Sequence, residues 1–588
     1  MRASPLLLVC LTLLGQEAPP RSFRQWLGDL EVGGSRLEQR QDGAFRELRS
    51  HEWMVISRLG QEIKQDLSET ARQAADGSLA FTWRLQLSAE PFEGRAEWSP
   101  REPAILAIHA ANGPALVKDV PAGAILWPEE LETRLKEAAR TRQAFQATTF
   151  SFPVQQWSQL HLRPQGKAPL PGFPDTVHFT GEERQGAAST AVEVWISPTA
   201  GEVRHQAVLG GLRMLSQRAE LPAPVFAKGE TQGFFERSLQ KLPPHPFQPW
   251  LPELTLRLEG KPQDLPEDAQ QSRLGKSRWR LRRAALPTRL EATQPPVQGT
   301  PPTGEARYLS PSPLVPFQDP AFDGLLHRLA LPAGLSRWEL AQRVNSFVFD
   351  WIVEKDFTVG FASALEVCRL PRGDCTEHGV LAVALLRRLG VPARGVTGWV
   401  GLGETLGLHF WVEVRLKDRW IPMDPTFDQA PASAFRIKLG DTDLADLGGV
   451  GWESAASAFS GARWLPEREG ALPYGEGLSA KGDLLSGPAG VQLRLPGGRW
   501  TVKGGVLQLR TPTGGPWQVK AVTHPGEAQT RESRRLAGAH SRRSGWWDPA
   551  QSLLWMDLGE GRWLQLEGVS QDEAFDLLDQ LLAPVSSS

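Results

Sequence analysis

The chain has 588 residues, and its 65 Lys and Arg nearly balance its 67 Asp and Glu, for a net charge of −2. This length implies about three to five domains, and the charge balance excludes a nucleic-acid-binding protein held by a global basic field. Only three cysteines are present, too few for a disulfide framework or a four-cysteine zinc ribbon. Each cysteine can therefore be considered by itself.

Residues 1–18 combine a single Arg2, a short apolar run and small residues after it, which is typical of a signal peptide. The run is too short for a bilayer, which needs about 20 apolar residues. Cys10 could instead accept a lipid, but Val9 stands where a small residue is expected, so cleavage is favoured; an uncleaved anchor is a third possibility. No other segment approaches membrane-spanning length, and the mature chain is therefore expected to be exported, periplasmic or secreted, without an integral span.

Alternating apolar and polar residues predict an antiparallel, β-rich domain over residues 19–215, interrupted by a helical pattern at 129–143. The clearest alternation is at Leu79, Phe81, Trp83, Leu85 and Leu87. A binding or scaffold domain without chemistry of its own is the expected role. Residues 216–315 are rich in Pro and Arg and are interpreted as a small β unit followed by a linker.

Helical periodicity begins near residue 320, and we expect an α+β core over 316–446. Residues 447–490 are rich in Gly, Ala and Ser and are interpreted as a linker. Residues 491–588 are expected to form a small C-terminal α+β domain. Two hairpins are predicted there, and a capping box at 570–573 predicts a last helix. The hairpins join 491–495 to 500–502 and 554–558 to 563–566.

The stretch 373–392 is the most informative part of the chain. Asp374 as N-cap, Glu377 three residues later and Gly390 near the end predict a helix whose apolar middle is buried. Cys375 then falls in the first turn, where free amides and the helix dipole favour a thiolate, the nucleophilic form of cysteine. Taken alone, Cys375 would more often be an inert buried cysteine.

A second pattern supplies partners for this cysteine. Residues 408–414 alternate like a strand with His409 on the polar side, and a turn at 417–419 leads into a returning strand that reaches Asp424. Folding this hairpin puts Asp424 opposite His409 or one diagonal away. A carboxylate beside an imidazole fixes its tautomer. Cys375, His409 and Asp424 are therefore predicted to form a nucleophile, a base and a residue that orients the base.

These motifs are Gly-Asp-Cys-Thr-Glu-His from residue 373, Gly-Val-Pro-Ala-Arg from 390, His-Phe-Trp-Val-Glu-Val from 409 and Trp-Ile-Pro-Met-Asp-Pro-Thr from 420. Together they resemble the transglutaminase-like superfamily in its bacterial form, over about a fifth of the chain. The resemblance implies a papain-like α+β core with Cys375 as nucleophile, His409 as base and later acid, and Asp424 as its orienting residue. Phe410 is a departure, because small residues are common there in the family.

The predicted protein is thus a multidomain α+β cysteine enzyme that forms a thioester from an amide or ester of a protein or peptide substrate and passes it to water or an amine. No cofactor, metal site or nucleic-acid partner is indicated, and the oligomeric state is not indicated either. Two alternatives stay open. Cys368 could form a disulfide with Cys375, or the domain could be a catalytically silent scaffold or binding protein of the cell envelope. His378 is interpreted either as a neighbour of the site or as a core histidine.

Overall fold

The computed structural model describes most of the chain between residues 20 and 445, and beyond that the segment 463–467 and separate strands up to Glu567. Within 20–445 the undescribed residues are 43, 59–60, 112–114, 186–187, 210–211, 220–238, 243–252, 261–264, 286, 355–360 and 403–404. The predicted signal peptide at 1–18 and the helix predicted after residue 570 lie outside the described residues.

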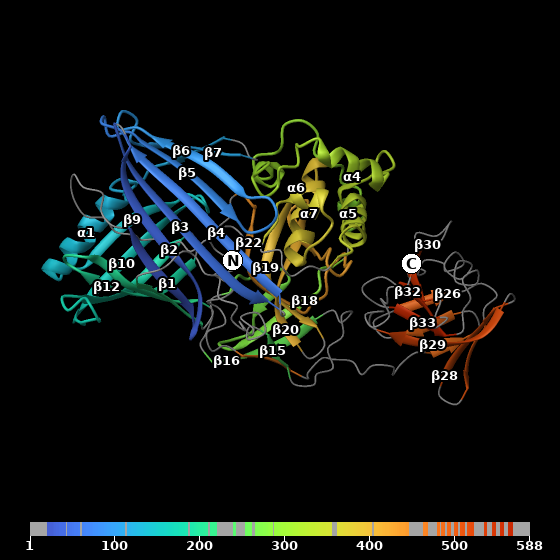
Figure 1. The fold of residues 1–588 in the computed structure, drawn as a ribbon. Helices are drawn as coiled ribbons and strands as arrows, with labels where there is room; N and C mark the ends of the chain where they lie inside the picture. The colour runs from blue at the N-terminus through green and yellow to red at the C-terminus, as the bar shows by residue number, and fades with distance from the viewer. Residues whose placement is uncertain are drawn as a thin grey trace.

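The N-terminal region forms one antiparallel sheet of 14 strands (Figure 1). The first half comprises β1 (Arg21–Leu27), β2 (Leu30–Asp42), β3 (Phe45–Arg58), β4 (Gln61–Gln73), β5 (Leu79–Gln86), β6 (Phe92–Trp98), β7 (Ile105–Ala110) and β8 (Ala115–Asp119). The second half comprises β9 (Phe145–Ser151), β10 (Gln156–Lys167), β11 (Val177–Gln185), β12 (Ala188–Ser197), β13 (Gly201–Leu209) and β14 (Leu212–Arg218). The halves meet where β1 pairs with β14, and β8 and β9 are the two edges.

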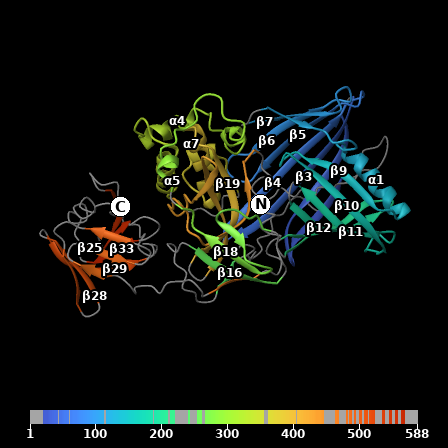
Figure 2. The same cartoon turned by 180° about the vertical axis from the view of Figure 1, so that it is seen from behind.

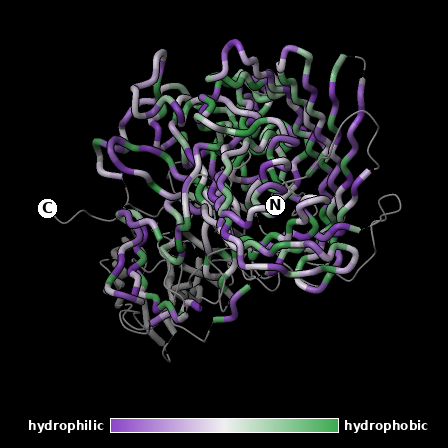
Figure 3. Tube along the Cα trace, turned by 90° about the vertical axis from the view of Figure 1, so that its left-hand side faces the viewer, coloured by the Kyte–Doolittle hydropathy of each residue, from purple (hydrophilic) through white to green (hydrophobic). Residues whose placement is uncertain are grey.

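The period-two pattern of the sequence decides which face of this sheet is buried. In β5 the residues Leu79, Phe81, Trp83 and Leu85 are buried, and those between them are exposed or partly exposed. Figure 3 shows hydrophobic and hydrophilic residues alternating along the strands. We call the face that carries Phe81 the inner face. Helix α1 (Pro128–Thr141) packs on its second half through an apolar stripe that includes Leu131 and Leu135.

The α+β core follows, and its helices and strands are adjacent in Figures 1 and 2. It contains α3 (Arg289–Ala292), η1 (Ala306–Leu309), α4 (Ala321–Leu329), α5 (Arg337–Trp351), α6 (Ala364–Arg369), α7 (Cys375–Arg388), β19 (Ala393–Leu402), β20 (Thr405–Leu416), β21 (Arg419–Met423) and β22 (Arg436–Thr442). The sheet order is β15-β20-β19-β22, with β21 paired to β20 and the short β15 (Gln240–Lys241) at one edge. Helix α7 lies against β19, β20, α5 and α6, which explains why it is apolar on all sides.

A four-stranded sheet packs beside this core. It has the order β17-β18-β16-β23 and consists of β16 (Glu253–Glu259), β17 (Gln271–Arg273), β18 (Arg278–Arg282) and β23 (Arg463–Pro466). Trp279 and Trp464 of this sheet share an apolar cluster with Trp399 of β19. The chain on either side of the core therefore contributes to one sheet.

The N-terminal sheet also docks onto the core, through the loop after β5. The Glu366 carboxylate of α6 accepts hydrogen bonds from Ser88 Oγ at 2.6 Å and from the backbone amides of Ala89 and Glu90 at 3.0 Å. Leu87 on the same loop belongs to the apolar cluster of the core. Helix α6 is the last element before the segment that leads into Cys375, so this contact holds the entrance to α7.

The C-terminal part contains two separate sheets. The first consists of β24 (Ser479–Lys481), β25 (Leu484–Gly487) and β26 (Val491–Arg494). The second has seven strands, namely β27 (Arg499–Lys503), β28 (Val506–Thr511), β29 (Gly514–Val522), β30 (Arg534–Ala537), β31 (Ser544–Asp548), β32 (Leu553–Asp557) and β33 (Trp563–Glu567). The predicted hairpin of 554–558 with 563–566 is confirmed as β32 and β33.

The predicted hairpin of 491–495 with 500–502 is wrong. β26 pairs with β25, whereas β27 pairs with β28, and the two strands belong to different sheets. Lys503 faces Val506 in the register of β27 and β28, and the two residues between them in the sequence are Gly-Gly. Such a dipeptide is a strong signal for a two-residue hairpin, and here it prevails over the Pro-Gly-Gly segment that precedes β27. Apart from this pairing, the expected multidomain α+β organisation with an antiparallel N-terminal region is confirmed.

Candidate active site

Cys375 is the first residue of α7, and its side chain is buried, with 7% of its surface exposed. The predicted capping box is confirmed: Asp374 Oδ1 accepts from the amide of Thr376 at 2.9 Å, and Glu377 Oε2 accepts from the amide of Asp374 at 2.9 Å. This double cap fixes the first turn, because it satisfies amides that an α-helix leaves free. The cysteine is therefore held at a defined helix start.

Glu377 is fully buried and braces the segment on both sides of the cysteine. Its Oε1 also accepts from the amide of Ala362 at 3.0 Å. Burial, reinforced by the neighbouring charge of Asp374, raises the pKa of Glu377 above its usual range. Gly373 is required next to it, because its φ is +138° and a Cβ there would lie 2.4 Å from Glu377 Cγ.

His409 and Asp424 form the second part of the site. His409 Nε2–H donates to Asp424 Oδ2 at 2.7 Å, and both side chains are buried, with 4% and 0% of their surfaces exposed. In the hairpin of β20 and β21, Val412 faces Met423, so Asp424 lies one diagonal from His409. This is the second of the two positions that the sequence allowed. The ring of Phe427 stacks on His409 with the centroids 5.1 Å apart.

Arg436 is a buried partner of Asp424 that the sequence did not reveal. Its Nη2 donates to Asp424 Oδ2 and, at 2.9 Å, to Gln429 Oε1, while its Nη1 donates to the carbonyl of Ser433 at 3.0 Å. Burial alone would raise the pKa of Asp424, but the charges and hydrogen bonds of His409 and Arg436 outweigh it and hold this pKa well below its usual range. Asp424 is thus an ionised carboxylate whose Oδ2 accepts hydrogen bonds from both His409 and Arg436.

The segment that carries Asp424 is closed on itself. The amide of Asp424 donates to the Gln429 carbonyl at 2.8 Å, and the amide of Gln429 donates back to the Asp424 carbonyl at 3.0 Å. Because Arg436 holds both the Gln429 side chain and the Asp424 carboxylate, β22 fixes this short loop against β20. The only signal for this contact in the sequence was a lone arginine at the start of an apolar strand, and it did not indicate which residue Arg436 contacts.

Packing of α7 on β20 brings the cysteine helix to the histidine strand. Gly379 lies one turn after Cys375, and a Cβ added there would be 2.4 Å from the ring of Phe410, the residue after His409. A Cβ on Gly395 of β19 would be 2.3 Å from the tip of the same ring. The bulky Phe410 is therefore accommodated by two glycines, which lets helix and sheet approach closely.

Cys368 and His378 have structural contacts of their own. Neither Cys368 nor Cys375 takes part in a disulfide in the described structure. The Cys368 thiol donates to the Ala321 carbonyl at 3.5 Å, and burial raises its pKa to about 11. His378 is fully buried and its Nδ1–H donates to the Asp374 carbonyl at 2.5 Å, so it supports the first turn of α7.

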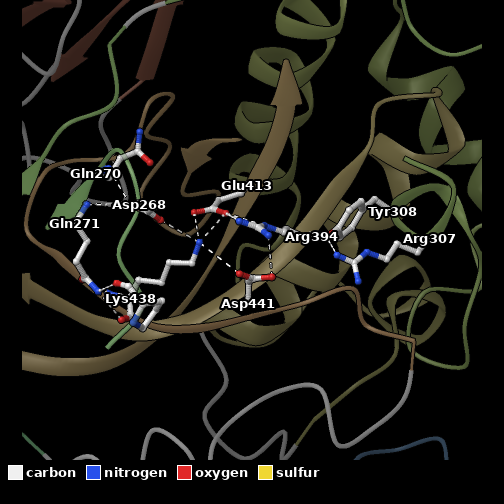
Figure 4. A network of polar contacts seen from close by, with 10 residues as sticks. Asp268, Gln270, Gln271, Arg307, Tyr308, Arg394, Glu413, Lys438 and Asp441 are labelled. Carbon is white, nitrogen blue, oxygen red and sulfur yellow. Dashed lines mark hydrogen bonds and ion pairs between the residues drawn. The ribbon is translucent and has the colours of Figure 1, made fainter. Parts of the chain in front are cut away.

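A charge network with a buried centre extends along β20 beyond the histidine (Figure 4); Arg394, Glu413 and Lys438 are buried, and the outer carboxylates of Asp268 and Asp441 are exposed. Glu413 lies on the same side of the strand as His409 and accepts from Arg394 Nε at 2.8 Å and from Lys438 Nζ at 3.1 Å. Lys438 also reaches Asp268 Oδ2 at 3.3 Å, and Arg394 reaches Asp441 at 2.8 Å. The network joins β19, β20 and β22 to the segment before β17. Paired buried charges of this kind fix geometry more than they add stability.

The comparisons with known proteins agree with this architecture. Residues 333–425 match the family model of the transglutaminase-like superfamily, so the resemblance read from the motifs is confirmed for this segment. The matched segment contains Cys375, His409 and Asp424. The match supports a papain-like enzyme core at the level of the superfamily. None of the curated proteins matches the chain.

Two solved structures are similar to parts of the chain. One is a β-barrel-like protein of a domain of unknown function from Brucella abortus, with 12% identity, a TM-score of 0.28, and coverage of 36% of this chain and 98% of its own. The other is a "Putative Cysteine Protease" from Cytophaga hutchinsonii, with 15% identity, a TM-score of 0.22, and coverage of 39% of this chain and 82% of its own. Among the residues that the structure describes, no helix is long and apolar enough to cross a membrane.

Proposed function

We propose that this protein is an exported cysteine enzyme that transfers or hydrolyses acyl groups of a protein or peptide substrate through Cys375, His409 and Asp424. The observation that carries the proposal is the buried 2.7 Å hydrogen bond between His409 and Asp424 on the strands against which the Cys375 helix packs. The family match over residues 333–425 supports the same assignment. Export rests on the pattern of residues 1–18.

The proposed reaction begins with proton transfer from the Cys375 thiol to His409. Because Nε2–H is donated to Asp424, Nδ1 is the ring nitrogen left to accept this proton. Sγ then attacks the carbonyl carbon of an amide, and a tetrahedral intermediate forms. Its oxyanion can accept from the backbone N–H of Cys375, which lies in the first turn of α7, where the helix dipole favours an anion.

Collapse of the intermediate breaks the C–N bond, and His409 returns the proton to the leaving amine. The resulting thioester on Cys375 is resolved when water or an amine gives a proton to His409 and attacks the carbonyl carbon, and the thiol regains that proton at the end. Water as acceptor makes the enzyme a peptidase, amidase or deamidase; a lysine amine makes it a crosslinking enzyme. Asp424 keeps the imidazole in one tautomer and stabilises the imidazolium in both halves.

The test is to incubate the full-length chain with a peptide library and a primary-amine donor, and to identify products by mass spectrometry. Wild type and Cys368→Ala should give the same products, because Cys368 lies outside the proposed site, whereas Cys375→Ala should give none. Cleaved or deamidated peptides would identify hydrolysis, and amine-adducted peptides would identify crosslinking. A folded wild-type protein that yields no more product than Cys375→Ala across the library would contradict the proposal and favour the catalytically silent scaffold.

A further inference from the structure

The inner face of the N-terminal sheet carries a band of polar side chains that apolar residues flank on both sides. Antiparallel partners point to the same side of a sheet, so the register defines this band. Gln25 faces Gly33 and Ser216, Glu52 faces Ser35, and Ser50 faces Glu69. These strands, β14, β1, β2, β3 and β4, are neighbours across the middle of the sheet.

Several members of this band are buried without a hydrogen-bond partner among the described residues. Glu52 is fully buried, its carboxyl oxygens fall outside hydrogen-bond geometry, and Gln25 is the one neighbouring side chain described as acting on it as a donor. Both amide atoms of Gln65, which is 2% exposed, also lack a hydrogen bond within the described residues. On the adjacent β13, His205 faces Ser216 and is 3% exposed; its ring nitrogens form no hydrogen bond in the described part of the chain, and Nδ1 lies 3.7 Å from Glu202 Oε2. Folded proteins pair nearly all buried polar groups. A concentration of unpaired groups on one face is therefore evidence of a polar compartment.

The band borders a cavity of about 70 Å³ on the same face. Its lining includes Leu48, Ser50, Glu69, Phe81 and Phe152. One water needs on the order of 10–15 Å³ on a comparable measure, so this volume holds several waters or a short aliphatic chain. The cavity has an acidic end and an apolar wall.

Within the described residues, the acidic end has no counter-charge. Glu69 is only partly buried because it borders the cavity, and its one hydrogen bond in the described structure comes from Ser50 Oγ at 3.4 Å. Glu52 lies on the same face, and the charge of Glu69 acts on it. No lysine or arginine in the described part of the chain pairs with either carboxyl group. Burial raises the pKa of Glu52 to about 8 and that of Glu69 to about 7, as expected for carboxyl groups that lack a cation.

We propose that this cavity is a binding site for a primary ammonium group on a short apolar stem, such as the end of a lysine side chain or a free alkylamine. The ammonium would donate one hydrogen bond to the Glu69 carboxylate and a second to Ser50 Oγ. The stem would lie along Leu48, Phe81 and Phe152. A buried ammonium–carboxylate pair is a charge-assisted contact, and it would supply the cation that the acidic end lacks.

This site lies on the N-terminal sheet, and its proposal does not depend on the chemistry proposed for Cys375. Charge and size together define the ligand. A neutral molecule of the same size leaves the carboxyl end unpaired, and a larger cation does not fit the volume. A free alkylamine and a lysine in a peptide share this chemistry. They differ in that the lysine can bind only if the cavity also admits the peptide backbone that carries it.

The experiment is isothermal titration of the full-length protein with n-butylammonium and, as a neutral isostere, n-butanol. We expect n-butylammonium to bind and n-butanol to bind at least about tenfold more weakly, because the alcohol cannot form the charge-assisted bond. Glu69→Gln should weaken n-butylammonium by about tenfold or more for the same reason. Glu93→Gln is the matched control: Glu93 lies on the opposite face of the sheet, paired with Arg84, and its loss should leave binding unchanged.

A second variant removes the space instead of the charge. Ala71 lines the cavity and is buried, so Ala71→Leu should abolish binding while Glu69 stays in place. Titration with Nα-acetyl-lysine N-methylamide then separates the sources: binding supports capture of lysine in a chain, and its absence beside n-butylammonium binding supports a free amine. Equal affinity for amine and alcohol, no binding of either, or a folded Glu69→Gln or Ala71→Leu protein that binds like wild type would overturn the proposal.

Discussion

Removing the Arg436 guanidinium tests the electrostatics of the site. In Arg436→Gln, Asp424 keeps its hydrogen bond to His409 but loses the cation that shares the same carboxylate oxygen. Breaking a buried ion pair by deleting one partner costs about 3–5 kcal/mol. The retained bond to His409 places the expected loss near the lower end, about 3 kcal/mol at pH 7. With a urea slope of about 1–3 kcal/mol per molar, the unfolding midpoint of the core should fall by about 1 M or more.

The pH dependence has a definite sign. The pKa of Asp424 is depressed by folding, so its contribution to stability is present above the unfolded value of about 3.9 and is lost as pH falls through the folded value. In Arg436→Gln the pKa of Asp424 is less depressed, and the carboxylate takes up a proton at a higher pH than in wild type. Protonation relieves the unpaired charge. The difference in stability between variant and wild type should therefore shrink as the pH is lowered from 7 towards the usual carboxyl range.

The assay can report on the core alone. Cys368 is buried and its pKa of about 11 keeps the thiol protonated in the folded state, so pulsed thiol labelling of Cys368 in a Cys375→Ala background measures opening of this region. Arg140→Gln is the matched control, because Arg140 forms an exposed pair with Glu137 on α1 and its loss should leave the midpoint in place. An Arg436→Gln midpoint equal to that of wild type at pH 7, or a loss that is the same at every pH, would refute this reasoning.

Two further predictions concern contacts between elements of the core and its neighbours. Gly379→Ala places a methyl group 2.4 Å from the Phe410 ring and should destabilise the core by about 1–3 kcal/mol, as measured by urea unfolding; Phe410→Leu should recover part of this loss, and two strictly additive effects would contradict the contact. Glu366→Ala removes the acceptor of three hydrogen bonds from the loop after β5 and should speed proteolytic cleavage in that loop. Unchanged cleavage of this variant would show that the loop is held by other contacts, such as the pair of Glu90 with Arg369 of α6.

Local patterns in the sequence were sufficient for the parts of the site that depend on neighbouring residues. The N-cap of Asp374 and its capping box with Glu377 follow from spacing within one turn. The diagonal relation of His409 and Asp424 follows from strand period and a short turn. For these elements, residue type and distance along the chain decide the geometry before any tertiary contact forms.

Contacts between distant segments could not be predicted in the same way. Nothing near Arg436 in the sequence points to Asp424, and the tight fit of Phe410 between Gly379 and Gly395 exists only once three elements pack. β23 pairs with β16, far away in the chain, for the same reason. Local sequence was not sufficient even for every hairpin. The predicted pairing of 491–495 with 500–502 is wrong because the chain holds two turn signals close together and local sequence did not rank them.

The proposed function requires that Cys375 is a nucleophile activated by His409. The most direct measurement is the rate of alkylation of Cys375 by iodoacetamide near pH 6, with site occupancy read by peptide mass spectrometry and Cys368 as internal control. We expect rapid modification of Cys375, little modification of Cys368, whose thiol is protonated at this pH, and at least about tenfold slower modification of Cys375 in folded His409→Ala. Equal rates at the two cysteines, or an unchanged rate in His409→Ala, would contradict it.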